Sequence, residues 1–486
     1  MNWILIAEII YVIAVIAVCI RVVYFTNHPT KTLGYLLLIV FVPIIGIIFY
    51  FSFGMNYRKN ELYTKKLVDD DNLWQQVRTE ICASSDRILM SLDEKLRPDL
   101  QLVRYLTSEL SPLTSGNTAK LLVNGEEKFP EVIKALEEAK EHIHIEYYIY
   151  ENNLIGQEIA SLLTRKAKEG VKVRFIYDDF GSRGIRKNIA KKLKEESIEA
   201  FPFYEIVFVR FANRLNYRNH RKIIVVDGKK AFVGGINISD RYVNNGKYAS
   251  KNDCYWRDTH LMIEGPGVQH LQYIFICDWN FCTGSQLENV FNYFPFFTGA
   301  QGYGNKLIQI AASGPDSASP TILYSLLYAI HGAEKEVLIT TPYFIPEESI
   351  MDAIMVAALG GVTIRMLVPF ESDSKIVELA ACSYFDQLLD AGVQLYFYKK
   401  GFVHAKTIVV DRKVAIIGTA NMDIRSFDLN FEVNAIIYDN EIANNLAAIF
   451  ENDLKDAELV DISKWSQRSI PRKFLEKTAR LVSPLL

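Results

Sequence analysis

The amino-acid sequence predicts an α/β protein in which two αβα sandwich repeats form one site, preceded by a hairpin of two transmembrane helices. Three observations lead to this prediction: a doubled motif, strands that alternate with helices around both copies, and two apolar runs at the N-terminus. The motif occurs as His220-Arg-Lys222, Asp227 and Gly234-Gly-Ile-Asn237, and again as His404-Ala-Lys406, Asp411 and Gly418-Thr-Ala-Asn421. Identical spacing in both copies indicates a duplicated unit.

Length and charge set the first limits. At 486 residues and 55.5 kDa the chain is too long for one ordinary domain, so two core-forming units are expected. The formal net charge of -3 does not suggest the strongly basic domain that is typical of nucleic-acid binding, so nucleic acid is not a predicted partner. The six cysteines show no two-residue spacing, which argues against a zinc ribbon or a redox motif.

The N-terminal segment, residues 1–58, is predicted to be a two-helix membrane anchor. Its apolar runs, Trp3 to Ile20 and Leu33 to Phe53, are each close to the roughly 20 residues that span a bilayer. A cleaved signal peptide is the less favoured alternative, because no Lys or Arg precedes the first run and a second run follows. The flanking cations favour a multi-pass protein of the cell membrane with both termini, and therefore the catalytic domain, in the cytoplasm. These cations are Arg21 and Lys31 between the runs, and Arg58, Lys59, Lys65 and Lys66 after them.

Residues 59–117 are expected to form a helical connector, and the first repeat is expected at 118–288. Strands are predicted at 119–123, 143–149 and 171–177, with helices at 130–140 and before Gly170. The connector prediction depends on apolar residues at near-helical spacing, namely Leu67, Leu73, Val77, Ile81 and Ile88.

The second repeat, residues 305–470, follows the same order. Strands are predicted at 337–341 and 362–368, separated by a helix that ends at Gly360-Gly361. The two repeats share a helix stop and strand start, Gly170-Val-Lys-Val-Arg174 and Gly361-Val-Thr-Ile-Arg365. Strands that alternate with helices in this way are typical of an αβα sandwich.

Two further segments have two interpretations each. The linker 289–304 is rich in aromatic residues, which suits either a loop in contact with lipid or packing between the repeats. The tail 471–486 is basic and amphipathic, and suits either a helix on an anionic membrane surface or an ordinary docking helix. Its apolar residues are Phe474, Leu475, Leu481, Val482 and Leu485, and its basic residues include Lys473, Lys477 and Arg480.

The doubled motif predicts chemistry on a phosphodiester. Transfer without a metal needs a nucleophile, a proton donor for the leaving alkoxide and fixed positive charge around the phosphate oxygens. Two imidazoles, two ammonium groups and two amides meet this need: His220 and His404, Lys222 and Lys406, and Asn237 and Asn421. A metal site is not expected, because Lys is not a usual ligand and two His residues lack a third ligand nearby.

Carboxylates are expected to orient the imidazoles. Asp258 follows the first motif and Glu432 occupies the comparable place after the second, so both are predicted to hold a His tautomer. Asp227 and Asp411 belong to the motif and are candidate catalytic residues. A structural role at the turn that ends each motif strand is the favoured interpretation for both.

These residues resemble the phospholipase D superfamily, whose members carry a duplicated His-Lys-Asp motif, and within it the family of bacterial cardiolipin synthases. The resemblance covers about 119–439 and implies two phospholipase D-like repeats around one active site. The matching stretches are Tyr217-Arg-Asn-His-Arg-Lys222, Trp256-Arg-Asp258, Ile263-Glu-Gly-Pro-Gly267, Thr341-Pro-Tyr-Phe344, Gly418-Thr-Ala-Asn-Met-Asp423, Arg425-Ser-Phe427 and Ser483-Pro-Leu-Leu486.

The resemblance also implies a reaction. One phosphatidylglycerol loses glycerol to a phosphohistidine enzyme, and the hydroxyl of a second phosphatidylglycerol attacks to give cardiolipin, with His220 as nucleophile and His404 as general acid and base. The implied partners are phosphatidylglycerol, cardiolipin and the lipid bilayer, and no cofactor is implied. A hydrolytic membrane phospholipase D is the main alternative; a nuclease and a catalytically inactive membrane scaffold are weaker ones.

Overall fold

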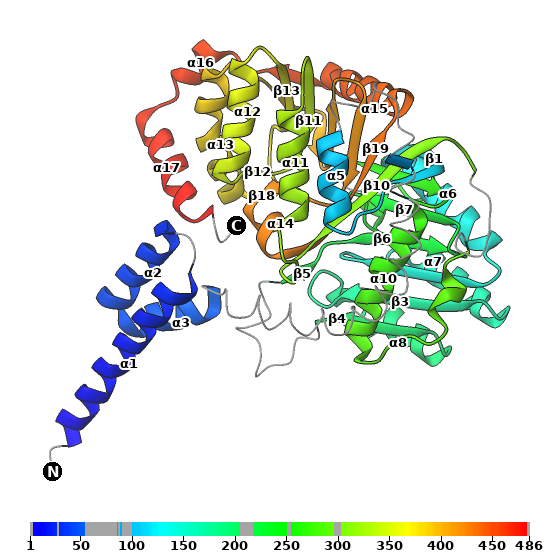
Figure 1. Cartoon of the computed structure of the whole chain (residues 1–486), viewed down its shortest axis with the longest axis horizontal. Coiled ribbons are helices and arrows are strands. Elements are labelled where there is room, and N and C mark those ends of the chain that lie inside the picture. Colours follow the sequence, from blue (N-terminus) through cyan, green and yellow to red (C-terminus); the bar gives the residue numbers. More distant parts are fainter. Residues whose placement is uncertain are drawn as a thin grey trace.

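The computed structural model shows an N-terminal group of helices attached to a large α/β unit (Figure 1). Several predicted features lie outside the described residues: most of the connector, the cations from Arg58 to Lys66, part of the aromatic linker and Leu485. The structure describes residues 3–26, 29–53, 85, 88–89, 100–204, 217–249, 254–295 and 303–483.

The N-terminal apolar runs form three helices: α1 (Trp3–Phe25), α2 (Pro29–Phe41) and α3 (Pro43–Phe53). Within the described residues, α1 is the one helix that is long and apolar enough to cross a membrane. The second run was expected to form one spanning helix, but it breaks before Pro43. Proline has no amide hydrogen to donate and its ring clashes with the carbonyl four residues earlier.

Gly46 allows α3 to fold back closely against α2. A Cβ atom at this position would lie 2.6 Å from the Ile39 backbone. An ion pair links the N-terminal helices to the α/β unit. The Lys31 ammonium of α2 lies 3.3 Å from the Asp428 carboxylate of α14 (Ile424–Asp428). The connection between α1 and α2 therefore lies beside the α/β unit.

One 16-stranded sheet runs through both repeats. Fifteen strands follow the order β20-β14-β13-β11-β16-β17-β19-β10-β1-β9-β7-β6-β2-β3-β4, and the sixteenth, β5 (Arg218–Asn219), pairs with β19 outside this path. The two halves therefore repeat the same strand order outward from the antiparallel β10–β1 pair. The first repeat supplies β1 (Thr114–Val123), β2 (His142–Tyr147), β3 (Lys172–Asp178), β4 (Glu199–Phe203), β6 (Lys222–Val226), β7 (Lys230–Gly234) and β9 (Thr259–Glu264). The second supplies β10 (Lys306–Ser313), β11 (Glu336–Thr340), β13 (Thr363–Pro369), β14 (Gln394–Tyr398), β16 (Thr407–Val410), β17 (Val414–Gly418), β19 (Asn430–Tyr438) and β20 (Ala457–Leu459).

Helices cover both faces of the sheet, as an αβα sandwich requires. In the first repeat these are α6 (Asn124–Glu138), α7 (Leu154–Lys168), α8 (Ile189–Glu195) and α10 (Val268–Thr283). The second repeat carries α11 (Thr321–His331), α12 (Glu348–Leu359), α13 (Lys375–Asp390) and α15 (Asn440–Asp453), joined by α5 (Leu100–Ser108), α16 (Ile462–Ser466) and α17 (Ile470–Leu481).

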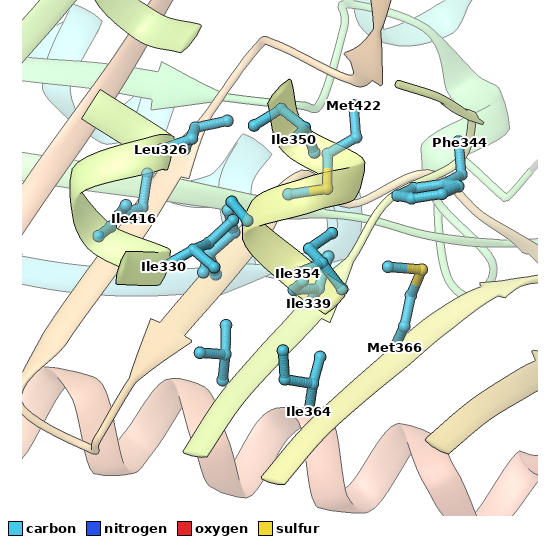
Figure 2. Close-up of a cluster of buried hydrophobic side chains, with 14 of the residues drawn as sticks. Leu326, Ile330, Ile339, Phe344, Ile350, Ile354, Ile364, Met366, Ile416 and Met422 are labelled. Carbon is cyan, nitrogen blue, oxygen red and sulfur yellow. The ribbon is translucent and has the colours of Figure 1, made fainter. Parts of the chain in front are cut away.

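The core is divided by the sheet. One layer of the second repeat packs α11 and α12 over the strands, where Leu326 and Ile330 of α11 and Ile350 and Ile354 of α12 meet Ile339 of β11 (Figure 2). On the opposite face, α10 and α15 share one apolar cluster with strands from both repeats. The two repeats therefore form a single packed body.

Four of the five predicted strands are confirmed to within two residues at each end, whereas the strand predicted at 119–123 begins five residues earlier, at Thr114. The shared helix stop is also confirmed, because Gly170 and Gly361 both have positive φ, +93° and +99°, which L side chains rarely adopt. The predicted start of the first helix at Pro130 is wrong, since α6 begins at Asn124. Glu126 and Glu127 in its first turn suit the positive end of the helix dipole and move the start upstream of the proline.

Candidate active site

Two short parallel strand pairs cross between the repeats and build the site. β5 (Arg218–Asn219) leads into the first motif and pairs with β19, which carries Glu432. β15 (Gly401–Val403) leads into the second motif and pairs with β8 (Tyr255–Arg257), which precedes Asp258. Each motif histidine is thus placed beside the carboxylate of the other repeat.

The histidines and carboxylates form two crossed pairs. His220 Nδ1 lies 2.9 Å from a carboxylate oxygen of Glu432, and His404 Nδ1 lies 2.7 Å from Asp258 Oδ2. Both carboxylate side chains are fully buried, whereas each imidazole keeps about a tenth of its surface exposed. The predicted orienting carboxylates therefore lie on the Nδ1 side of each ring, which leaves Nε2 outside these two contacts.

Burial keeps both imidazoles neutral at pH 7. It lowers the pKa of His220 to about 4, although the Glu432 carboxylate acts to raise it, and lowers that of His404 to about 3. The pKa of Glu432 lies below its ordinary value: burial, the largest effect, acts to raise it but is outweighed by His220 and neighbouring donors. A neutral imidazole beside a fixed carboxylate is suited to nucleophilic attack.

The two lysines lie beneath the histidines in equivalent positions. Lys222 Nζ donates to the His220 carbonyl at 2.6 Å, and Lys406 Nζ donates to the His404 carbonyl. Burial lowers the pKa of Lys222 to about 7 and that of Lys406 to about 8, with the buried carboxylates opposing this shift. An anionic phosphate above them would favour their charged forms.

The two motif asparagines line the same cavity as the histidines. Asn237 Nδ2 donates to the Tyr242 hydroxyl at 2.7 Å, while its Oδ1 accepts from the Ile149 amide at 3.2 Å. Asn421 Oδ1 is buried and has no hydrogen-bond partner among the described residues. The structure therefore brings six of the predicted residues and the two orienting carboxylates to one place.

Sequence reasoning missed several residues of this cavity, whose volume is about 290 Å³. Arg218 and Arg425 were part of matching stretches but were assigned no role, and their cationic character was the signal that could have identified them. The additional lining residues with polar or aromatic side chains are Tyr148, Arg218, Arg241, Tyr242, Trp256, Tyr343, Asp373, Asp423, Arg425 and Asn430.

Asp227 and Asp411 do not line the cavity. The Asp227 carboxylate accepts from the amides of Lys140, Glu141 and His142 at 2.8–2.9 Å, at the entrance to β2. The Asp411 carboxylate accepts in the same way from the three amides of residues 334–336 at the entrance to β11. Both residues have positive φ, +52° and +50°. Their contacts support the structural interpretation over the catalytic one.

One motif position differs between the two half-sites. Gly235 leaves room for the Asp258 carboxylate, which a Cβ atom would overlap. Its counterpart Thr419 donates its hydroxyl to Glu432, which also accepts from Asn430 Nδ2 at 3.1 Å. Glu432 therefore accepts hydrogen bonds from Thr419 and Asn430 as well as from His220. These additional donors stabilise the anionic carboxylate, and they make the surroundings of His220 differ from those of His404.

Two family models match the chain. The model described as "Cardiolipin synthase, PLD-like domain" matches residues 132–272 and 326–454, one segment in each repeat. The model described as "Phospholipase_D-nuclease N-terminal" matches residues 9–54, which contain the apolar helices.

Curated relatives are similar in sequence to this chain along almost its whole length. A cardiolipin synthase of Alkalihalophilus pseudofirmus is 38% identical over 99% of this chain and 93% of its own length. One from a Geobacillus species (strain WCH70) is 41% identical over 95% of this chain and 90% of its own length. Among solved structures, the phosphatidylserine synthase of Haemophilus influenzae aligns with a TM-score of 0.62 at 14% identity, covering 81% of this chain and all of that one, which shows a shared fold.

Proposed function

The chain belongs to the cardiolipin synthase family of the phospholipase D superfamily, and from this premise we propose how its two half-sites transfer a phosphatidyl group. Its enzyme class is that of a phosphatidyltransferase. The proposal assigns the substrates, the order of the histidines and the arrangement at the membrane.

In the first step, His220 Nε2 attacks the phosphorus of one phosphatidylglycerol. A nitrogen–phosphorus bond forms, the bond from phosphorus to the headgroup glycerol breaks, and His404 donates a proton to the departing alkoxide. His404 is neutral in the free enzyme and takes up this proton from solvent when the anionic donor phosphate enters the site, because the phosphate charge raises the pKa of the imidazole. Lys222, Lys406 and the Asn237 and Asn421 amides hold the phosphate oxygens as charge moves among them.

In the second step, a second phosphatidylglycerol supplies the attacking hydroxyl. His404 removes its proton, the oxygen–phosphorus bond forms and the bond to His220 breaks, giving cardiolipin and the free enzyme. One primary alcohol replaces another, so the exchange needs no nucleotide. A hydrolytic reaction would use water instead, and the relatives named as synthases do not favour it.

The observation that carries the assignment of His220 is the environment of Glu432. This carboxylate is fully buried and bonded to His220, Thr419 and Asn430, and its pKa is lowered. A fixed anion on Nδ1 stabilises the positive charge that develops when Nε2 becomes bonded to phosphorus. Asp258 serves His404, which must both release and accept a proton.

Purified protein incubated with phosphatidylglycerol alone tests the reaction. We expect cardiolipin and free glycerol in equal amounts, because each transfer releases one glycerol. Phosphatidic acid as the dominant product would support the hydrolytic alternative, and neither product from folded protein would overturn the proposal. A His220→Ala and His404→Ala double variant serves as the control for contaminating enzymes.

We also propose that the membrane meets the protein along α1 and α17. The exposed face of α17 carries Ile470, Phe474, Leu475 and Leu481 beside Lys473 and Lys477, which suits an anionic lipid surface. Vesicle sedimentation with and without anionic lipid tests this. A Phe474→Ser and Leu475→Ser variant should lose more binding than one altered at the exposed Leu359 of α12.

The Lys31–Asp428 ion pair bears on the orientation of the anchor. If it persists in the membrane, the connection after α1 stays on the side of the catalytic unit, and α1 alone crosses. This differs from the hairpin with both termini in the cytoplasm. Labelling Trp3→Cys and Thr30→Cys, which leave the ion pair intact, from outside intact cells distinguishes them. A cytoplasmic catalytic unit leaves position 3 reactive in the single-span arrangement and position 30 reactive in the hairpin.

A further inference from the structure

A second cavity, of about 210 Å³, lies beside the active-site cavity in the second repeat. It is bounded by the segment after β13, by α13 and β14, and by α16 and α17. Tyr343 and Val377 line both cavities. The Tyr343 hydroxyl donates to Asp373 Oδ2 at 2.8 Å, so one hydrogen-bonded side chain stands between the two spaces.

The walls of this second cavity are largely aromatic and aliphatic. Phe397 lies with its ring centroid 6.0 Å from those of Phe370 and Phe385 and 5.8 Å from that of Trp465. Both cations of the lining are paired, since Lys375 bonds Glu378 at 3.1 Å and Arg472 bonds Glu476 at 3.0 Å, whereas the Glu371 carboxylate has no ion pair among the described residues. A lining without an unpaired cation suits an apolar ligand better than an anionic headgroup.

A lipid substrate creates the need for such a space. When its phosphate reaches the buried histidines, the acyl carbons nearest the glycerol backbone leave the bilayer. Each methylene left in water would weaken binding about fourfold, whereas transfer from bilayer to an apolar protein wall changes little. An apolar cavity that adjoins the site removes this penalty.

We propose that the cavity lined by Phe370, Ala381 and Phe397 holds the first acyl segment of a phospholipid bound at the active site. The proposal rests on the proposed function and adds an acyl subsite to it. Because Tyr343 and Val377 line both cavities, a phospholipid whose phosphate lies at the active site can place the start of an acyl chain in this second cavity.

The position of α17 provides a route from the membrane. α17 packs against α13, contributes Arg472 to the cavity, and exposes Phe474 and Leu475 to 69% and 55%. In Figure 1 it descends from α16 toward the end of the molecule from which the N-terminal helices extend. An acyl chain can therefore pass along an apolar helix face before it enters the cavity.

Filling the cavity tests the proposal. Ala381 is half-buried, lines this cavity and does not line the active-site cavity, so Ala381→Phe should occupy the space without touching the reacting groups. Ala357→Phe on α12 is the matched control, half-buried and outside both cavities. We expect Ala381→Phe to lower kcat/KM for dioleoyl phosphatidylglycerol about tenfold or more, the equivalent of two methylenes. For glycerophosphoglycerol, which has the same phosphodiester but no acyl chains, the change should be less than about threefold.

A photolabel gives a readout that does not depend on activity. Phosphatidylglycerol with a diazirine on the first acyl carbons should label peptides that contain 342–344, 365–397 or 462–475 in the full-length wild-type protein, and less so in Ala381→Phe. Labelling confined to other segments, or equal loss of activity with dioleoyl phosphatidylglycerol and with glycerophosphoglycerol, or equal loss in both variants, would overturn the acyl subsite. Failure of the wild type to form any transfer product would instead count against the proposed function, while the photolabel would still decide the subsite.

Discussion

Replacing Glu432 by Gln probes the crossed pairing most closely, because it keeps the shape of the side chain and removes its charge. The buried carboxylate accepts from His220 Nδ1, from the Thr419 hydroxyl and from Asn430 Nδ2 at 3.1 Å. A Gln amide offers one acceptor oxygen, so an NH₂ group must face at least one of these donors. His220 then loses both its preferred tautomer and the anion that stabilises its cationic adduct.

The expected size of the effect follows from this geometry. In serine proteases, the equivalent loss of a buried carboxylate beside a catalytic histidine lowers turnover about 10⁴-fold. Glu432 contacts Nδ1 of His220 as that carboxylate contacts its histidine, so we expect Glu432→Gln to slow formation of the phospho-enzyme by about 10³-fold or more. An unpaired buried donor would also cost about 1–3 kcal/mol of unfolding free energy.

Rapid-quench measurement of acid-labile phosphate on the protein provides the assay, with thermal unfolding to confirm that the variant is folded. Asp258→Asn is the matched comparison, because Asp258 holds His404 at 2.7 Å in the other half-site. It should slow release of the adduct as well as its formation. If Glu432→Gln forms the adduct at the wild-type rate while Asp258→Asn does not, the assignment of the two histidines is reversed.

Three further predictions concern other parts of the site. The value of kcat/KM should fall as pH rises through about 7 to 8. Burial lowers the pKa of Lys222 to about 7 and that of Lys406 to about 8, so both lose their positive charge in the free enzyme over this range. A profile that stays level to pH 9.5 would show that these charges are not required. Asp227→Ala should lower the unfolding free energy, measured by urea titration, by about 1–3 kcal/mol, because three backbone amides lose their acceptor. A catalytic role for Asp227 would instead appear as lost turnover in a protein of unchanged stability. Gly235→Ala should lower turnover about tenfold or more, since the new Cβ atom displaces the Asp258 carboxylate, and an active variant with unchanged kinetics would contradict this packing.

Much of the fold could be predicted because its signals are local and repeated. Segments such as 171–177 and 337–341 indicated buried strands, and the matched Gly170 and Gly361 marked the same helix stop in both halves. The doubled motif identified the histidine, lysine and asparagine residues of two equivalent half-sites. Asp258 and Glu432 were identifiable as partners because they occur at comparable places after each motif.

Other features could not be derived from local patterns. The crossed pairing depends on contacts between residues about 150 to 210 positions apart, such as the hydrogen bonds from His404 to Asp258 and from His220 to Glu432. The missed Tyr343 reaches the cavity from a loop after β11, and no periodicity indicates that direction. Pro43 was visible in the sequence, but whether a proline kinks a helix or ends it depends on the neighbouring packing.

The most direct measurement is to locate the covalent intermediate. His404→Ala protein is incubated with phosphatidylglycerol, quenched at neutral to alkaline pH and digested, and the modified peptide is sequenced by mass spectrometry. Nucleophilic attack by His220 predicts an adduct on the peptide that contains His220 and none in the His220→Ala variant. An adduct on His404 in the His220→Ala variant, or none on His220 when cardiolipin is still made, would contradict the account.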